Sequence, residues 1–244
     1  MLVSFYTPPF VFSTSLGQIA LLAPKNLNNF ISCNKQDSLL LGKSNTAQYL
    51  SGVYFLHQLK QGSNLPTSNM QESILKPKCA KIDLDKCEES TGSKELDIFK
   101  MTKQWLDMYF SGEILLNMPP VILKGSNFRI RVWRELLKIP YGKTSTYLTI
   151  AQKIAKDMHI AKMSAQAVGG AISNNPISII IPCHRVIGSN GSLIGYAGGL
   201  NKKKILLDFE AKQCQNNIGK IRKIDSTLDY ISHIAIMSKF TKIY

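Results

Sequence analysis

The chain has 244 residues, a hydrophobic content of 44% and a formal net charge of +14. This length is enough for one large or two small domains with an ample core. No apolar run approaches the roughly 18 residues of a membrane-spanning helix, and no basic segment precedes an apolar one at the N-terminus. We therefore expect no membrane contact and no signal peptide, and we predict a cytoplasmic protein.

The five cysteines are an odd and scattered set, which fits a reducing compartment better than a disulfide framework. Cys33, His57, Cys79 and Cys87 invite a zinc hypothesis, but they form none of the closely spaced pairs of a compact zinc site. We expect no metal.

The positive charge is unevenly distributed along the chain. Residues 121–210 carry 13 Lys and Arg against 4 Asp and Glu, a net charge of +9, whereas residues 1–120 have a net charge of +1. Such an excess is expected of a surface that binds a polyanion. A solvated lysine-rich surface also explains it, so charge alone does not indicate nucleic acid.

The first hundred residues give two distinct patterns. Short apolar-rich runs at 10–14 and 18–22 flank Ser15-Leu16-Gly17, which predicts a β-hairpin. Residues 33–95 are polar and mixed, and we expect them to be partly structured or mobile, with only residues 49–59 ordered.

Two helices are predicted on either side of a proline-rich linker. Apolar spacing predicts a helix over residues 96–110, and a second one over 128–137 that ends before Pro140. Met118-Pro119-Pro120 lies between them. We place a domain boundary there, with an N-terminal domain over residues 1–118.

A helix-turn-helix is predicted next. The run from Thr144 to Thr146 offers N-caps for a helix that begins at Tyr147, and residues 164–172 form a second helix of small residues. Gly169-Gly170 in the second helix either admits another backbone at close range or packs tightly on a neighbouring helix. The sequence leaves both interpretations open.

Residues 177–181 are four isoleucines and one serine, a run that predicts a buried strand with alternating faces. Pro182 should end this strand and present Cys183 and His184 at the break. A thiol needs a base or a positive neighbour to become a thiolate near neutral pH, and His184 and Arg185 are the candidates. The alternative is an ordinary core cysteine beside a partly exposed histidine.

The remaining elements are a turn and a helix. Residues 188–192 predict the tight turn of a hairpin, and Asn201 is a candidate cap for a helix over 202–210. The side chains expected to face inward from this helix are Ile205, Leu206 and Phe209. Residues 211–244 contain no motif, and we treat them as a C-terminal extension of unknown role.

The sequence Pro182-Cys183-His184-Arg185-Val186, followed by Gly195-Tyr196-Ala197-Gly198-Gly199-Leu200, resembles the O6-alkylguanine-DNA alkyltransferases, also called methylated-DNA–protein-cysteine methyltransferases. The resemblance runs well over residues 96–210. It implies an α+β fold with a small N-terminal domain that contains a sheet. A mostly helical domain over residues 121–210 would carry the helix-turn-helix and an active-site strand.

The resemblance also implies a chemistry. Cys183 would take an alkyl group from O6 of guanine in DNA, with O4-alkylthymine as a further candidate substrate. His184 would accept the thiol proton through a water, and Glu210, 27 residues beyond Cys183, would hold His184. Asn175 matches the asparagine of the hinge before the active-site strand. Because a thioether has no activated leaving group, the protein should act once, and we expect no cofactor.

Other residues match positions that bind the substrate. Tyr147 would donate a hydrogen bond to the flipped base, the backbone N–H of Ala197 would point toward O6, and Gly198 would leave room for the alkyl group. A lone tyrosine in a helix such as Tyr147 would otherwise be interpreted as a core residue.

The expected partner is double-stranded DNA with an alkylated guanine, bound by a monomer. Gln166, Arg185 and Ser189 are the predicted DNA-binding residues. Gln166 is a departure, because well-known members have an arginine there that fills the gap left by the flipped nucleotide. The join between the two helices is also longer than in those members.

Two other classes of function remain as alternatives. A lesion-binding protein without chemistry would resemble this family but lack the cysteine, so Cys183 argues against it. A helix-turn-helix regulator would use Cys183 as a sensor, but no second effector domain is recognisable.

Overall fold

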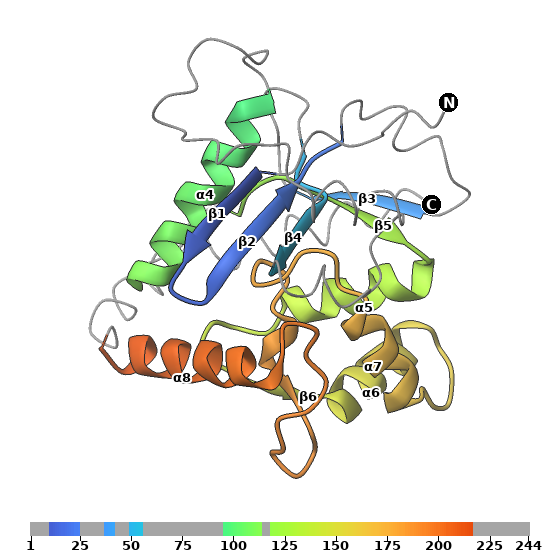
Figure 1. Cartoon of the computed structure of the whole chain (residues 1–244). Coiled ribbons are helices and arrows are strands. Elements are labelled where there is room, and N and C mark those ends of the chain that lie inside the picture. Colours follow the sequence, from blue (N-terminus) through green and yellow to red (C-terminus); the bar gives the residue numbers. More distant parts are fainter. Residues whose placement is uncertain (1–9, 25–36, 42–48, 56–94, 114–117, 217–244) are drawn as a thin grey trace, which may run out of the picture.

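The N-terminal hairpin forms as predicted and becomes part of a small sheet (Figure 1). In this computed structural model, residues 10–24, 37–41, 49–55, 95–113 and 118–216 are described. Strand β1 (Phe10–Thr14) pairs antiparallel with β2 (Gly17–Leu22), and β2 pairs antiparallel with β4 (Gly52–Phe55). Gly17 has a positive φ of 107°, a conformation that glycine adopts without steric cost in a tight turn.

A second pairing joins segments that are far apart in the sequence. Strand β3 (Asp37–Leu41) pairs antiparallel with β5 (Val121–Gly125), and Leu50 forms a parallel bridge with Val121. The strand that follows the proline-rich linker therefore pairs with the N-terminal region. The division of the chain near residue 118 stays a prediction.

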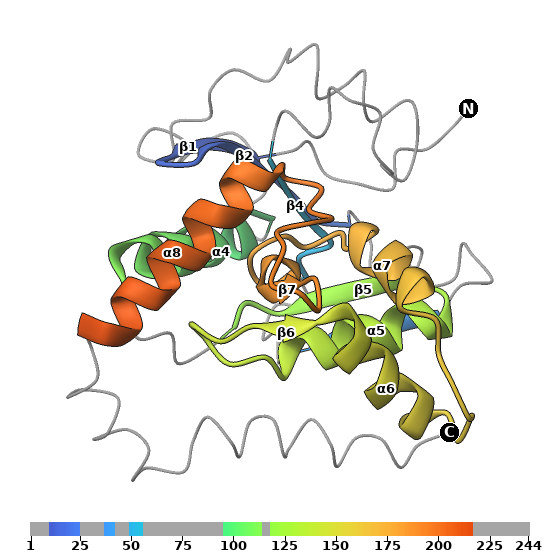
Figure 2. The same cartoon turned by 90° about the horizontal axis from the view of Figure 1, so that it is seen from below.

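Helix α4 (Glu95–Ser111) is the helix predicted over residues 96–110, and it lies alongside β1 in both ribbon views (Figures 1 and 2). The rings of Phe10 and Phe99 stack with their centroids 5.8 Å apart. This contact packs α4 against the three-stranded sheet, and such packing adds to the stability of a β1–β2 hairpin that would be marginal alone.

Three helices of the C-terminal part begin at side-chain caps. Helix α5 (Asn127–Leu137) is capped by Ser126, α6 (Tyr147–Asp157) by Thr146, and α7 (Ala165–Ser173) by Ser164, and each cap oxygen accepts from a backbone N–H three residues on. Such caps satisfy N–H groups that have no partner within the helix. All three predicted helices are confirmed.

Helices α6 and α7 lie next to each other and form the predicted helix-turn-helix (Figure 2). The indole N–H of Trp133 in α5 donates to the Ala171 carbonyl oxygen in α7 at 2.9 Å and fixes α7 to the helix behind it. On the outer side, a Cβ added at Gly170 would meet nothing within 4 Å, whereas one at Gly169 would contact the Tyr147 ring at 3.7 Å. Gly170 therefore leaves open space, and Gly169 packs on Tyr147.

The strand predicted over residues 177–181 does not form. Ile177 makes a single parallel bridge with Val53 of β4, residues 178–180 are a turn, and Ile179 has a positive φ of 71°. Cys183–Arg185 then form a 3₁₀ helix, η1. All five residues of the run are buried, so no solvent face exists to require alternation. An apolar run of this length does not distinguish a strand from another buried backbone path.

The turn predicted at residues 188–192 forms, but the hairpin does not. The N–H of Gly188 donates to the Ser192 carbonyl oxygen at 2.9 Å. Strand β7 (Val186–Ile187), just before this turn, pairs in parallel with β6 (Ser145–Thr146) instead of with the residues after the turn. A turn motif specifies a local reversal and leaves the partner of the preceding strand open.

Helix α8 (Leu200–Asn216) starts before its predicted cap and continues six residues past Glu210. Its buried residues are Lys203, Leu206 and Glu210, which share one helical face. Ile205, predicted to face inward, is 50% exposed. The inward prediction is confirmed for Leu206 and wrong for Ile205, because two charged side chains take the buried face.

The core joins both parts of the chain, which gives the predicted α+β architecture. One continuous cluster of buried side chains includes Leu21 and Phe55 from the sheet and Trp133, Leu136 and Ile181 from the C-terminal part. Among the described residues, no helix combines the length and the apolarity needed to cross a membrane.

Candidate active site

The turn that replaces the expected strand places Cys183 beside Asn175. The Asn175 side-chain amide donates to the Cys183 sulfur at 3.1 Å and to the Ile181 carbonyl oxygen at 2.9 Å, and its oxygen accepts from the Ile177 N–H at 3.0 Å. Asn175 therefore holds the turn and contacts the thiol at once. Cys183 is only 5% exposed, as the predicted nucleophile of a covered site would be.

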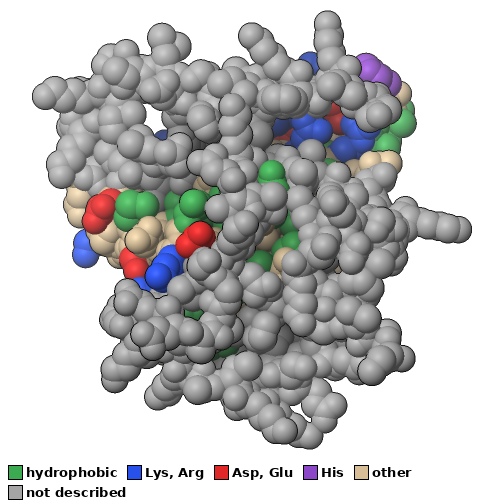
Figure 3. Space-filling model, turned by 90° about the horizontal axis from the view of Figure 1, so that it is seen from above, with side chains coloured by type: hydrophobic (Ala, Val, Ile, Leu, Met, Phe, Trp, Pro, Cys, Tyr) green, Lys and Arg blue, Asp and Glu red, His purple; other side chains and the backbone are tan. Residues whose placement is uncertain are grey.

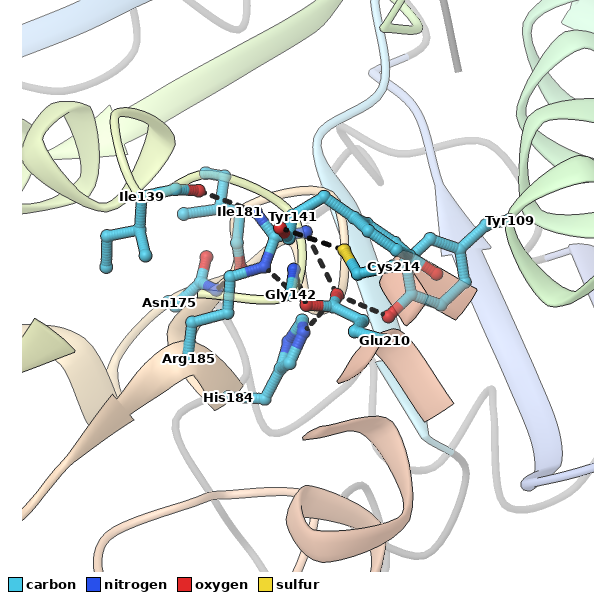
Figure 4. Close-up of polar contacts among 10 residues, drawn as sticks. All are labelled: Tyr109, Ile139, Tyr141, Gly142, Asn175, Ile181, His184, Arg185, Glu210 and Cys214. Carbon is cyan, nitrogen blue, oxygen red and sulfur yellow. Dashed lines mark hydrogen bonds and ion pairs between the residues drawn. The ribbon is translucent and has the colours of Figure 1, made fainter. Parts of the chain in front are cut away.

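His184 and Glu210 are brought together as a buried pair (Figure 4). The Nε2 atom of His184 lies 2.8 Å from Oε1 of Glu210, and neither side chain is exposed to solvent. An ionised carboxylate only accepts, so Nε2 must carry the proton and Nδ1 has its lone pair free. Within the described part of the chain, Nδ1 has no hydrogen-bond partner.

The Glu210 carboxylate accepts five hydrogen bonds from separate parts of the chain (Figure 4). Oε1 accepts from His184, from the hydroxyl of Tyr109 at 2.7 Å and from Nη2 of Arg185 at 2.9 Å. Oε2 accepts from Nε of Arg185 at 2.9 Å and from the N–H of Gly142 at 3.0 Å. A buried carboxylate needs such compensation for its lost hydration.

The pKa values of the three groups follow from these contacts. Burial alone would raise the pKa of Glu210, but hydrogen bonds from His184 and Arg185 and the charge of Arg185 lower it well below its usual value. Burial, together with the charges of Arg185 and Lys203, lowers the pKa of His184, although the contact with Glu210 opposes the shift. Burial also raises the pKa of Cys183, although Asn175 and Lys203 oppose the shift. The resting site therefore holds a thiol, a neutral imidazole and a carboxylate.

Arg185 is the counter-ion of Glu210 and not a surface group. It is 8% exposed, and its remaining bond from Nη1 goes to the Ile139 carbonyl oxygen at 2.7 Å. Its guanidinium also lies over the Tyr141 ring, 5.5 Å from the centroid. Three of its N–H donors are thus used inside the protein, and the DNA contact predicted for Arg185 stays a prediction.

The loop expected to bind the base closes over Tyr147. The Tyr147 hydroxyl lies 3.0 Å from the carbonyl oxygens of both Ile194 and Gly195. Burial, followed by the charge of Cys183, raises the pKa of Tyr147 to about 12, so the hydroxyl stays a donor at neutral pH. In this state the donor expected to meet the base is engaged by the loop backbone.

The two predicted substrate positions of the glycine loop, Ala197 and Gly198, differ in exposure. Gly198 is buried, and a Cβ there would come within 2.4 Å of the Tyr196 ring and 3.1 Å of the Phe55 ring. Only glycine therefore lets the loop pack at this point. Ala197 is exposed, as its proposed backbone contact with a ligand requires.

Lys203 is a charged residue of this site that the sequence did not suggest. Its side chain is fully buried, Nζ donates to the Ile194 carbonyl oxygen at 2.5 Å, and Nζ lies 5.8 Å from the centre of the Tyr147 ring. Burial lowers the pKa of Lys203 to about 8, and the proximity of Cys183 limits the fall. Its helical spacing from Leu206 and Glu210 was the one signal that could have revealed it.

The other predicted DNA-binding residues are on the surface. Gln166 is exposed in the first turn of α7, and Ser189 is exposed in the turn after β7. Arg131 of α5 is also exposed, but it pairs with Asp157 at 2.5 Å. Figure 3 shows that Lys and Arg side chains gather at one corner of the face seen from above, with acidic side chains among them. Surface charge there is partly neutralised within the protein.

No metal site is apparent in the part of the chain that the structure describes, where no group of three or more potential ligands occurs. Cys33, His57, Cys79 and Cys87, the residues considered for zinc, all lie outside the described residues.

A buried cysteine, histidine and carboxylate, together with a helix-turn-helix, define the class of DNA-binding proteins with a cysteine nucleophile. Residues 127–212 match the family described as 6-O-methylguanine DNA methyltransferase, DNA binding domain. A methylated-DNA–protein-cysteine methyltransferase of Mycobacterium leprae is 51% identical over 108 residues, which are 44% of this chain and 62% of the relative. The chain thus spans less than two thirds of that relative's length.

Archaeal and structural relatives extend the match. A methylated-DNA–protein-cysteine methyltransferase of Methanosarcina mazei is 42% identical over 122 residues, half of this chain and 72% of the relative. The crystal structure of Mycobacterium tuberculosis OGT in complex with DNA aligns with a TM-score of 0.52 and 28% identity, over 83% of this chain and 92% of that one. This chain belongs to the methylated-DNA–protein-cysteine methyltransferase family.

Proposed function

We propose that this protein repairs DNA by moving an alkyl group from O6 of guanine irreversibly to Cys183, once per protein molecule. O4-alkylthymine is the second candidate substrate. The observation that carries the proposal is the pair of buried contacts between Asn175 and Cys183 and between His184 and Glu210, in a chain that also has a helix-turn-helix. The names of the relatives and the solved complex of one of them with DNA support it.

The reaction is a displacement at a saturated carbon. A bond forms between the Cys183 sulfur and the alkyl carbon, the bond from that carbon to O6 breaks, and the electron pair stays on O6. His184 accepts the thiol proton at Nδ1 through a water, and guanine regains one proton as it leaves. Overall, a thiol and an O6-alkylguanine give a thioether and guanine, so atoms and charge balance.

The contacts of Glu210 support this direction of proton transfer. Because Oε1 accepts from Nε2 of His184, the imidazole has the tautomer that can take a proton at Nδ1. The imidazolium that forms then lies against a carboxylate. Since the pKa of Cys183 is raised and that of His184 is lowered, the thiolate should form only as the reaction proceeds.

Lys203 would supply the positive neighbour that the thiol needs. The sequence offered His184 and Arg185 for that part, but Arg185 is neutralised by Glu210. Lys203 is buried near the site, and its charge lowers the pKa of Cys183. A positive charge there favours the thiolate over the thiol in the transition state.

Substrate entry would require two changes. O6 of guanine points into the major groove of the duplex, so the nucleotide must flip out of the stack to reach a cysteine that is 5% exposed. The Tyr147 hydroxyl must also leave the carbonyls of Ile194 and Gly195 to donate to the base. Gln166 and Ser189 would contact the DNA, and the protein would act as a monomer.

The single product would be a thioether on Cys183. No group in the site turns this sulfur into a leaving group, which explains a single turnover without a cofactor. We expect mass spectrometry, after incubation with duplex DNA that contains O6-methylguanine, to find one methyl group per chain, on Cys183. Cys214→Ala should react like the unmodified protein, whereas Cys183→Ala should bind the duplex and transfer nothing.

Three results would contradict the proposal. Methyl groups on Cys214 or on any cysteine other than Cys183 would do so, and so would several turnovers per protein molecule. Tight binding of the lesion without transfer would identify a lesion-binding protein instead.

A further inference from the structure

Tyr109 reaches the site from a helix outside the matched family segment. It lies on α4, 101 residues before Glu210, and its hydroxyl donates to Oε1 of Glu210 at 2.7 Å. The family match begins only at residue 127. Tyr109 is 1% exposed, so water does not compete for this bond.

The ring of Tyr109 is fixed on several sides. It stacks on Trp105 with centroids 5.8 Å apart, meets Tyr141 edge-on at 5.8 Å, and tilts against Phe209 at 5.9 Å. A buried aromatic ring packed in this way has little freedom to rotate its hydroxyl away. Burial, followed by Glu210, raises the pKa of Tyr109 well above its usual value, which keeps the hydroxyl a donor.

The bond from Tyr109 and the bond from His184 end on the same oxygen. Oε1 also accepts from Arg185, so three donors share one atom. A donor fixed by a rigid aromatic cluster holds the position of Oε1, and it draws electron density from the oxygen that would stabilise the His184 imidazolium. Both effects act on the base of the proposed reaction through the carboxylate.

We propose that Tyr109 is a positioning residue of the alkyl-transfer site, which fixes Oε1 of Glu210 toward His184 and limits the basicity of His184. The inference rests on the proposed function. It makes a helix of the N-terminal region part of the site, so that the segment 127–212 alone lacks one of the donors to Glu210.

The charged and titratable groups near this contact come from three further segments. Arg185 and His184 lie on η1, Tyr141 lies in the loop after α5, and Cys214 lies one turn beyond Glu210 on α8. Lys203 also acts on His184 and lowers its pKa. Replacing Tyr109 by phenylalanine leaves all of these in place and removes one hydroxyl.

Tyr141→Phe is the matched control. Tyr141 belongs to the same aromatic cluster, and its buried hydroxyl has no hydrogen-bond partner among the described residues. Both variants thus remove one buried phenolic oxygen, and only Tyr109→Phe removes a donor to Glu210.

The experiment measures the single-turnover rate of methyl transfer from duplex DNA over a range of pH, with thermal unfolding of each full-length variant. We expect Tyr109→Phe to slow transfer by roughly 3- to 30-fold, less than the loss of an acid–base group itself. Without the Tyr109 donor, Oε1 carries more negative charge and stabilises the imidazolium form of His184 more strongly. The pKa for protonation at Nδ1 therefore rises. The acid limb of the rate profile should therefore move to higher pH, whereas Tyr141→Phe should leave it in place.

The possible outcomes distinguish a positioning role of Tyr109 from a structural one. Equal rates and equal acid limbs for Tyr109→Phe and Tyr141→Phe would overturn the role of Tyr109. A slower Tyr109→Phe with an unshifted limb would show a structural role only. A Tyr109→Phe chain that does not fold would also overturn the proposal, because the hydroxyl would then serve folding. Failure of the unmodified protein to transfer any methyl group would instead reject the proposed function.

Discussion

The two nitrogen atoms of His184 face opposite kinds of surroundings. On the Nε2 side, Glu210 accepts five hydrogen bonds and is fully buried. Nδ1, in contrast, has no partner among the described residues, and we expect it to accept the proton of Cys183, whose sulfur Asn175 contacts. One side of the imidazole is therefore fixed by many bonds, and the other is left available.

This difference indicates that the proton transferred in the reaction is accepted at Nδ1 and not on the Glu210 side. A carboxylate that is held by α4, by the loop at Gly142 and by η1 cannot change its contacts without breaking several of them. The thiol side needs the opposite property, because the sulfur must lose its proton and gain a carbon. Preorganised groups stabilise charge without having to reorient during the reaction. The predictions below alter one side at a time.

Glu210→Gln should have the largest effect, since it removes the charge from the fixed side. We expect transfer to slow by about 10²–10⁴-fold, the range for loss of positioned acid–base help, with little change in affinity for the lesion. Arg185 would keep a buried charge without its partner, so stability should fall by roughly 3–5 kcal/mol. Rapid-quench measurements of transfer, with calorimetry to verify folding, test this prediction. An undiminished rate in the folded variant would show that the match at Glu210 is accidental.

Lys203→Met alters the thiol side and should have an intermediate effect. The charge of Lys203 lowers the pKa of Cys183, so its loss should raise that pKa and move alkylation to higher pH by up to about one pH unit. Titration of Cys183 reactivity with a small alkylating agent measures this shift. A profile identical to that of the unmodified protein would remove Lys203 from the site.

Although Lys203→Met should make Cys183 less reactive near neutral pH, it should make the folded protein more stable there. The folded pKa of Lys203 is about 8, below the ordinary 10.5, so burying the charge costs stability below pH 8, and this cost fades as pH rises toward 10.5. Lys203→Met should therefore unfold at a higher temperature than the unmodified protein at pH 7, and the difference should shrink above pH 8. Lys203→Met removes the lysine donor to the Ile194 carbonyl oxygen, but this oxygen still accepts a hydrogen bond from the Tyr147 hydroxyl.

Much of the fold was predictable because its signals are local. Thr146, one of the expected caps, begins α6, and Ser126 and Ser164 cap α5 and α7 in the same way, because a short polar side chain at a helix start acts without any tertiary contact. The run at 177–181 failed for the opposite reason. Its path depends on a bridge to Val53 and on hydrogen bonds from Asn175, which lie outside the run itself.

The residues of the site also divide into those with a local sequence signal and those placed by contacts between distant segments. Cys183, His184 and Glu210 were expected from a motif and its spacing, and the structure brings them together. Tyr109 lies 101 residues from its partner, and the sequence assigned Arg185 to the thiol or to DNA because no local pattern shows that a carboxylate will bind it. Contacts between distant segments follow from packing, which a single sequence does not display.

Gln166→Ala should have the smallest effect, because Gln166 is exposed on α7 and no contact links it to either side of His184 in the described structure. Its amide can fill part of the space left by a flipped nucleotide and can both donate to and accept from the orphaned base. We expect repair of duplex DNA to slow by roughly threefold to tenfold, since one neutral hydrogen bond contributes about 0.5–1.5 kcal/mol. Reaction with free O6-benzylguanine, which needs no flipping, should be unchanged.

Gln166→Arg sharpens the same test, because it adds the charge that glutamine lacks. It should tighten duplex binding and steepen the dependence of log affinity on log salt by up to about one unit, as one added phosphate contact would. Binding titrations at several salt concentrations measure this slope. If Gln166→Ala instead slows the reactions with duplex and with free base equally, Gln166 contributes through the packing of α7, and the flipped nucleotide must be replaced by another side chain.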